Sequence, residues 1–331
     1  MATYYGTKGQ KIQVLATDPS NLTEGQVWYN STSNTLKVYK NFTNAWLTGG
    51  NLNTARGLMA GAGTQTAGLA FGGSPTPTGA TEEYDGSAWT AGGNLGTARD
   101  KLGGAGTQTA GLAFAGEKFT GTPIPSRTVN ITEEYDGSTW TAGGNMTTAR
   151  RFLAGCGTQT AGLGFGGYKG IPPAPRLSNL TEEYDGTSWT AGGNLGTARQ
   201  RLSGCGTQTA GLGFGGYTTA NTNVTEEYDG STWTAGGNLA IARRYLGGVG
   251  TQTAGLGFGG YSDVGPTTST EKYDGTSWTT TGSMNTGRAP LSGAGTQTAG
   301  LGFGGTNPTN TGATEEFNAG PYLAAATVTQ T

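Results

Sequence analysis

The sequence of 331 residues contains no histidine, only two cysteines and 12 % charged residues. Without histidine the chain lacks the commonest metal ligand and the commonest general base, so a Ser–His–Asp triad is excluded. Two cysteines are too few for a disulfide framework. No apolar run approaches the roughly 18 residues of a membrane-spanning helix. The net charge of −2 gives no basic footprint for nucleic acid. We therefore expect neither nucleic-acid binding nor membrane insertion.

What the sequence has in excess is glycine, 64 residues, arranged in repeats. The heptapeptide GTQTAGL begins at Gly63, Gly106, Gly157, Gly206, Gly250 and Gly295. TEEYDG or TEKYDG precedes Trp89, Trp140, Trp189, Trp233 and Trp278, and an arginine opens each unit at Arg56, Arg99, Arg150, Arg199, Arg243 and Arg288. Units of roughly 40–50 residues indicate propeller blades or solenoid turns.

Each unit predicts four short strands. A segment rich in small residues follows the arginine, GTQT makes a turn, and AGLAFGG or AGLGFGG forms the second strand. TEEYD is the third strand, and Asp-Gly is a tight-turn signal into a fourth strand at the tryptophan. No helical period lies between them, so βαβ units and helical solenoids are poor fits. Four antiparallel strands at this period describe a propeller blade.

The repeat resembles the kelch repeat in its glycine doublet, its Tyr before a turn, its Trp after the turn and its linker Arg. The doublets are Gly72-Gly73, Gly166-Gly167, Gly215-Gly216, Gly259-Gly260 and Gly304-Gly305, with Ala115-Gly116 in the second unit. The resemblance covers about residues 46–318 and implies a fold but no function. Some kelch propellers are copper oxidases whose sites need histidine ligands, and the absence of histidine excludes that activity here.

The two ends of the repeat region predict how the last blade is completed. The last unit stops after Phe317 without its tryptophan, and a surplus tryptophan, Trp46, precedes the first unit. We predict that Trp46 lies on the fourth strand of the last blade, because pairing the chain ends removes two open sheet edges. The predicted fold is therefore all-β: a six-bladed kelch-like β-propeller with four-stranded antiparallel blades, the last closed by an N-terminal strand.

The segments outside the repeats differ in composition. Residues 1–45 predict two strands, 24–30 and 35–39, around a turn at 31–34. This hairpin, EGQVWYNSTSNTLKVYKN, resembles a small module that recurs in tailed-phage virion proteins, near tail-fibre or adhesin segments. The resemblance implies an attachment segment; the alternative is a cap on the propeller edge. Residues 46–318 are the predicted propeller, and residues 319–331 a tail with one possible strand.

Paired glutamates recur on the third strand, as in Glu82-Glu83, and invite comparison with a glycosidase site. Adjacent strand residues point to opposite faces, so one pair cannot flank a substrate. We expect instead that one glutamate of each unit bonds to a linker arginine, and that the arginines and tryptophans listed above, with Trp46, are structural. The fifth unit departs with Glu271-Lys272. No catalytic residue, metal ligand or cofactor is predicted.

Cys156 and Cys205 occupy equivalent first-strand positions in the third and fourth units. Other units carry Ala or Val at this position, so both cysteines are interpreted as small core residues. A disulfide between Cys156 and Cys205 of the neighbouring blades is the alternative.

The loops between second and third strands vary most. They span 74–80, 117–131, 168–180, 217–224, 261–269 and 306–313, and we expect them on the same face as the GGNLxTAR linkers. Proline-stiffened loops with aromatics and arginine suit recognition, because little entropy is lost on binding; drift of unconstrained loops is the alternative. The candidate binding residues are Phe119, Arg127, Tyr168, Lys169, Arg176, Tyr217 and Tyr261.

These observations favour a non-enzymatic structural protein of a tailed-phage virion. The opening residues lack an apolar secretion signal, so we expect synthesis in the host cytoplasm and location in the virion, tail-associated as a fibre, receptor-binding or adaptor part. Expected partners are other virion proteins, through residues 1–45, and a host-surface glycan or protein, in a multi-copy assembly. The alternatives are a lectin-like carbohydrate-binding propeller, a capsid-decorating protein and an intracellular kelch-type adaptor.

Overall fold

The computed structural model describes residues 12–19, 26–40, 44–119, 121, 126–170, 176–320 and 322–326. Within these ranges the chain is all-β and contains no helix. It divides into two compact units: a larger one, Trp46–Phe317, and a smaller one made of Met1–Ala45 and Asn318–Thr331.

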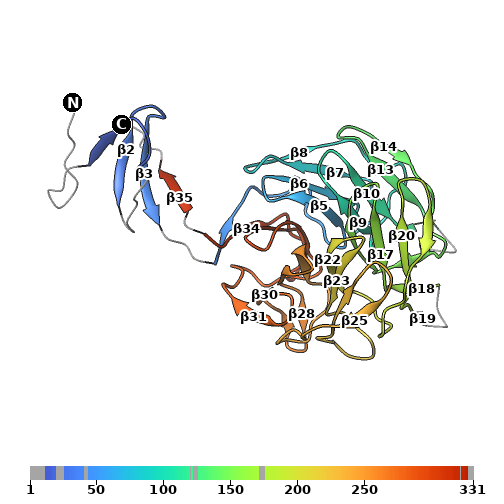
Figure 1. The fold of residues 1–331 in the computed structure, drawn as a ribbon. Helices are drawn as coiled ribbons and strands as arrows, with labels where there is room; N and C mark the ends of the chain where they lie inside the picture. The colour runs from blue at the N-terminus through green and yellow to red at the C-terminus, as the bar shows by residue number, and fades with distance from the viewer. Residues whose placement is uncertain are drawn as a thin grey trace. The chain divides into compact units, whose positions relative to one another are not determined.

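Four-stranded sheets make up most of the larger unit (Figure 1). The first contains β5 (Ala60–Thr64), β6 (Ala67–Phe71), β7 (Thr81–Tyr84) and β8 (Trp89–Ala91). The second contains β9 (Gly103–Gly106), β10 (Gly111–Phe114), β13 (Thr132–Tyr135) and β14 (Trp140–Ala142). The third contains β16 (Ala154–Gly157), β17 (Gly162–Phe165), β20 (Thr181–Tyr184) and β21 (Trp189–Ala191).

The other three sheets repeat this order. The fourth contains β22 (Ser203–Thr207), β23 (Ala210–Phe214), β24 (Thr225–Tyr228) and β25 (Trp233–Ala235). The fifth contains β26 (Gly247–Thr251), β27 (Ala254–Phe258), β30 (Thr270–Tyr273) and β31 (Trp278–Thr281). The sixth contains β32 (Ser292–Gly295), β33 (Ala299–Phe303), β34 (Thr314–Asn318) and β4 (Ala45–Thr48). We predicted that Trp46 lies beside the strand that ends at Phe317. This is confirmed, because β4 carries Trp46 and lies next to β34, which carries Phe317.

Short strands extend some of the loops. The pair β11 (Glu117–Phe119) and β12 (Ser126–Thr128) forms one hairpin, and β28 (Tyr261–Ser262) with β29 (Gly265–Pro266) forms another. In the third unit, β18 (Tyr168–Lys169) lies between β15 (Arg150–Arg151) and β19 (Arg176–Leu177).

Large side chains of one sheet fill the space over glycines of the next. Leu69 and Phe71 on β6 are completely buried. A Cβ atom added to Gly111 would lie 2.7 Å from Leu69 Cδ2, and one added to Gly104 would lie 2.8 Å from Phe71 Cζ. Both distances are shorter than a normal contact, so a side chain at either position would displace Leu69 or Phe71 from its packing.

Side-chain hydrogen bonds from a glutamine and a tryptophan join each sheet to the preceding one, and a tyrosine adds a third bond in five of the six sheets. From the second sheet to the first, Gln108 Nε2 donates to Tyr84 O at 2.7 Å, and Trp140 Nε1 donates to Thr81 Oγ1 at 2.9 Å. The hydroxyl of Tyr135 donates to Glu83 Oε1 at 2.5 Å. The glutamine and tryptophan bonds recur in every repeat. The sequence analysis had treated GTQT only as a turn.

The first sheet makes the same bonds to the sixth. Gln65 Nε2 donates to Phe317 O at 2.8 Å, Trp89 Nε1 to Thr314 Oγ1 at 2.9 Å, and Tyr84 Oη to Glu316 Oε1 at 2.6 Å. The innermost strands follow the same order, since β5 contacts both β9 and β32. The arrangement is compatible with a propeller-like fold, with β5, β9 and β22 near the middle and β8, β14 and β31 outside (Figure 1).

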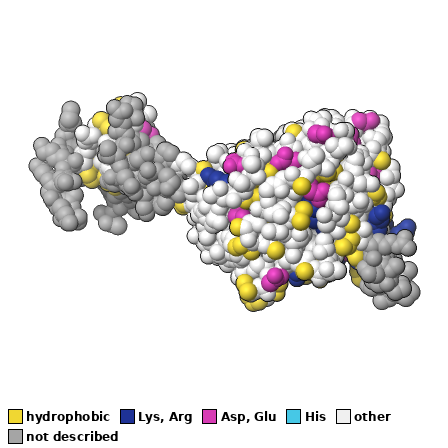
Figure 2. All heavy atoms as spheres, turned by 60° about the horizontal axis from the view of Figure 1, so that its bottom comes forward, with side chains coloured by type: hydrophobic (Ala, Val, Ile, Leu, Met, Phe, Trp, Pro, Cys, Tyr) yellow, Lys and Arg dark blue, Asp and Glu magenta, His cyan; other side chains and the backbone are white. Residues whose placement is uncertain are grey.

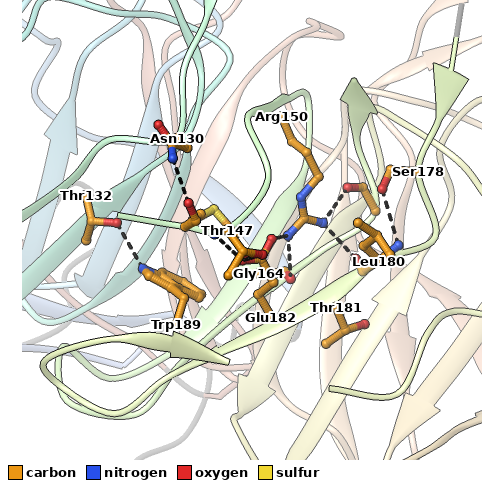
Figure 3. Close-up of polar contacts among 12 residues, drawn as sticks. Asn130, Thr132, Thr147, Arg150, Gly164, Ser178, Leu180, Thr181, Glu182 and Trp189 are labelled. Carbon is orange, nitrogen blue, oxygen red and sulfur yellow. Dashed lines mark hydrogen bonds and ion pairs between the residues drawn. The ribbon is translucent and has the colours of Figure 1, made fainter. Parts of the chain in front are cut away.

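Buried ion pairs link each linker to its own sheet. Arg150 Nη2 lies 2.9 Å from Glu182 Oε1, and Arg150 Nη1 donates to Leu180 O at 2.7 Å (Figure 3). The other Glu182 oxygen accepts from the backbone and hydroxyl of Thr147, both at 2.6 Å. The prediction that one glutamate of each unit bonds to a linker arginine is confirmed in all six repeats; the partner is the first glutamate of the pair and the arginine is that of the same repeat, Glu271 of the fifth included.

The interface between the fifth and sixth sheets replaces one polar contact. At the position of the second glutamate the fifth repeat has Lys272, and at the tyrosine position the sixth has Phe317. Lys272 Nζ lies 5.2 Å from the centre of the Phe317 ring, within cation–π range. The two departures from the repeat therefore face each other and compensate.

Cys156 and Cys205 are free and buried. Each thiol points to the neighbouring repeat, with Cys156 Sγ 3.8 Å from Thr207 O and Cys205 Sγ 3.6 Å from Thr251 O. Burial raises the pKa of Cys156 to about 12, so the thiol is unreactive at neutral pH.

The smaller unit is a four-stranded sheet in the order β1 (Gln13–Leu15), β2 (Val27–Asn30), β3 (Thr35–Lys40), β35 (Tyr322–Ala326). The predicted hairpin is present as β2 and β3, although residues 24 and 25 lie outside the described residues. The possible strand of the C-terminal tail is β35, which pairs with β3. Asp18 accepts hydrogen bonds from Trp28, Asn30 and Lys37, which lower its pKa to about 2.

Arg199→Met should lower the free energy of unfolding by about 3–5 kcal/mol, because Glu226 loses its ion-pair partner in a buried place. Urea unfolding followed by tryptophan fluorescence measures the change. Arg199→Met combined with Glu226→Gln is the matched control, and it should recover part of the loss. An unchanged single variant would contradict the structural role of the pair.

Lys272→Glu and Phe317→Tyr should restore the common tyrosine–glutamate bond only when combined. Lys272→Glu alone places a carboxylate against a ring without a hydroxyl and should be destabilising, whereas Phe317→Tyr alone keeps the contact between Lys272 and the ring and should change stability little. A double-mutant cycle in urea should give a favourable coupling of about 1–2 kcal/mol. Additive effects would show that the two positions do not interact.

Candidate ligand-binding site

The repeats differ sharply at the second residue after the linker arginine. The residues there are Leu58, Lys101, Phe152, Arg201, Tyr245 and Pro290, all different, whereas the next residue is Leu or Met in every repeat. All six positions line one depression of about 90 Å³, together with these Leu and Met residues. A position that varies within constant surroundings, at the rim of a cavity, is a candidate for ligand contact.

The backbone holds these side chains in an unusual conformation. Lys101, Phe152, Arg201 and Tyr245 have φ between 56° and 59°, in the left-handed region that non-glycine residues rarely adopt. A chain of hydrogen bonds supports them: Phe152 N donates to Lys101 O, Arg201 N to Phe152 O, and Tyr245 N to Arg201 O, at 2.8–2.9 Å. Such strain clusters at functional sites, where it fixes the direction of a side chain.

Arg201 lies among aromatic rings. Its guanidinium carbon is 5.0 Å from the centre of Phe152, 4.9 Å from Tyr245 and 5.5 Å from Tyr217. Phe152 and Tyr245 also meet edge to face at 5.7 Å. Among the described residues, no carboxylate oxygen lies within 4 Å of the Arg201 guanidinium.

Two further arginines extend the cluster outward. Arg244 lies over Tyr217 at 5.0 Å and over Tyr261 at 4.8 Å. Its Nη1 donates to Asn221 Oδ1 at 2.8 Å, and Asn221 Nδ2 donates to Asp263 Oδ1 at 2.7 Å. On the other side Arg151 lies over Tyr168 at 5.1 Å. The mouth cluster is defined as Lys101, Arg151, Phe152, Tyr168, Arg201, Tyr217, Arg244, Tyr245 and Tyr261.

Carboxylates stand at both sides of the mouth cluster: Asp263 is joined to Arg244 through Asn221, and Glu117 lies beside Lys101 and Arg151. Glu117 Oε2 lies 2.7 Å from Lys101 Nζ and 2.9 Å from Arg151 Nη1. Asp100 Oδ2 lies 3.6 Å from Lys101 Nζ. Burial raises the pKa of Asp100 to about 6, with the nearby Glu117 adding to the rise and Lys101 opposing it.

Charge is distributed unequally between the two ends of the sheets. The linkers and variable loops meet at one end, because the linker-side bridges Gln200↔Tyr217 and Arg244↔Tyr261 join them. This end carries the cations Lys101, Lys118, Arg127, Arg151, Lys169, Arg201 and Arg244, together with the acids Asp100, Glu117 and Asp263. The opposite end carries the Asp-Gly turns, with Asp85, Asp136, Asp185, Asp229 and Asp274. Backbone N–H groups lower the pKa of these aspartates. Figure 2 shows charged side chains only sparsely over the face in view.

The structure brings together only some of the residues that the sequence singled out. Tyr168, Tyr217 and Tyr261 belong to the mouth cluster, and Lys169 follows Tyr168 on β18. Phe119 is 61 % exposed and, like Arg127, lies on the β11–β12 hairpin. Arg176 pairs with Lys169 through the backbone of β19, and its side chain lies outside the described residues.

Sequence reasoning missed the inner residues of this site: Lys101, Arg151, Phe152, Arg201, Arg244 and Tyr245. The signal was present in the alignment of the six repeats with one another, where the two positions after the linker arginine read GL, DK, RF, QR, RY and AP. The candidate binding residues were chosen from the variable loops, which do not include these two positions.

No protein-family model matches the chain, and no curated protein is similar to it. Within the described ranges, no group of three or more His, Cys, Asp or Glu residues is placed to hold a metal ion. In the same ranges, no helix has the length and hydrophobicity needed to cross a membrane.

Asp100→Asn should change how stability depends on pH. The folded-state pKa of about 6 lies above the ordinary value of 3.8, so the folded state binds more protons and the parent loses stability as pH rises from 4 to 6. The variant should lose this decline. Thermal unfolding at pH 4, 5, 6 and 7 measures it, and parallel curves for parent and variant would contradict the assignment.

Proposed function

We propose that the six sheets form a six-bladed, kelch-like β-propeller whose last blade is completed by the strand carrying Trp46. Two cavities beside the innermost strands, of about 130 and 110 Å³, support this because residues of all six first strands line each of them. The bonds from the first sheet to the sixth, which repeat those between consecutive sheets, support it as well.

We further propose a non-enzymatic docking or display disk in the virion of a tailed phage, tail-associated as a fibre, receptor-binding or adaptor part. One observation carries the docking role: a constant hydrogen-bond network between sheets holds six different residues around one depression. A rigid frame that presents a variable rim suits recognition, since a preorganised surface loses little entropy on binding. The virion assignment is supported by the resemblance of the β2–β3 hairpin to phage modules. The smaller unit would bind other virion proteins.

A lectin-like role is the main alternative, and a capsid-decorating role is another. The blade tryptophans do not favour a lectin, because Trp46, Trp89 and Trp189 are buried in the core and donate to threonine hydroxyls. The mouth cluster does favour one, since it places aromatic rings and polar groups together at a depression.

Purified phage particles test the virion role. Mass spectrometry and immunogold labelling should detect the protein in particles at a copy number that exceeds one, with label at the tail. A chain lacking β2 and β3 should be lost from particles while the larger unit stays folded by circular dichroism. Absence of the full chain from particles would refute the virion role.

A further inference from the structure

Two cations of the mouth cluster, Arg201 and Arg244, have no carboxylate within 4 Å among the described residues. Each of the six linker arginines has a buried glutamate within 4 Å, and Lys101 and Arg151 share Glu117. Arg244 Nη1 already donates to Asn221 Oδ1, whereas Arg201 lines the depression itself. A guanidinium held between rings and left without an anion is preorganised to take one from a ligand.

The surroundings of Arg201 determine how an anion could approach. Phe152, Tyr217 and Tyr245 lie against the guanidinium at about 5 Å. The guanidinium already hydrogen-bonds to the Tyr245 hydroxyl, and its other N–H donors can bind a carboxylate. Burial raises the pKa of the Tyr245 hydroxyl, and the neighbouring Arg201 and Arg244 oppose that rise. The hydroxyl keeps its proton at neutral pH and can donate it to a ligand.

The acceptors around the cluster restrict the kind of anion. Glu117 and Asp263 lie at its two sides, and Asn221 lies beside Arg244. These oxygens repel a ligand that carries only carboxylates, such as an acidic peptide. They suit a ligand that combines one carboxylate with several hydroxyl donors, because each carboxylate oxygen can accept more than one hydrogen bond.

We propose that the mouth cluster binds an acidic sugar, a hexuronic or sialic acid residue, with its carboxylate on Arg201 and its hydroxyls on the flanking acceptors. The proposal rests on the docking role of this face and names the class of its ligand. Tyr261, 37 % exposed beside Arg244, offers ring surface to the C–H face of the sugar.

Isothermal titration of the full chain in 50 mM salt tests the proposal. The probes are N-acetylneuraminic acid and glucuronic acid, with glucose as the neutral analogue and a hexaglutamate peptide as the other anion. Binding of at least one acidic sugar is expected, with glucose at least tenfold weaker, because loss of the carboxylate leaves Arg201 unpaired. Equal binding of glucose, or no binding of either acid, would overturn it. Preference for the peptide would show that the ligand is a protein.

Variants of Arg201 make the test specific. Arg201→Met should weaken acidic-sugar binding at least tenfold, and Arg201→Lys should recover only part, because a lysine lacks the planar fork. Lys37→Met, the same change of charge in the smaller unit, should bind like the parent. Thermal unfolding checks that all variants are folded. Unchanged affinity of folded Arg201→Met would refute the assignment of the carboxylate.

Two readouts separate this proposal from the function on which it rests. If no acidic sugar binds but phage particles carrying Arg201→Met lose attachment to host cells, the ligand class is wrong and the docking role stands. If the protein is absent from particles but the sugar binds in an Arg201-dependent way, the virion role fails and the ligand assignment stands.

Discussion

A buried guanidinium at the start of every repeat organises the larger unit. Arg150 joins its linker to the second and third strands of its own sheet, through backbone carbonyl groups and through Glu182. The same glutamate accepts from the linker backbone at Thr147, so one ion pair determines where each linker enters its sheet. A buried charge without its partner is costly, which leaves few alternative placements of the linker. Regularity of the six sheets follows from repeating this one constraint.

Much of this architecture could be predicted from the sequence because its causes are local and repeated. Four strands per unit, the Arg–Glu pairs and the position of Trp46 all follow from motifs that recur in register. The role of Gln108 could not be foreseen, since its bonds reach residues of the preceding repeat, 24 and 40 positions away. The same limit applied to the mouth cluster, where Phe152, Arg201 and Tyr245 come from three different repeats. Their proximity depends on how sheets are placed around one another, which no single repeat encodes.

The contrast between framework and rim explains how one protein can be both uniform and specific. Hydrogen bonds between neighbouring sheets fix the glutamine, the tryptophan and, in five sheets, the tyrosine of the repeat. Leu58 and Pro290, by contrast, occupy the same structural position as Arg201, so the framework tolerates widely different side chains there. Function can therefore change at this rim without loss of fold, as is common where sites are built on rigid scaffolds.

The sixth sheet has a consequence for synthesis on the ribosome. Its outer strand, β4, leaves the ribosome before any other strand of the larger unit, whereas its neighbour β34 is among the last. At 5–20 residues per second, roughly 270 residues separate the two by about 15–55 s. During that interval Trp46 and its strand have no permanent partner. The first five sheets can form in order during synthesis, whereas the sixth cannot be completed before β34 is made. Until then the nascent chain exposes the unpaired strand β4 to chaperones or to neighbouring copies.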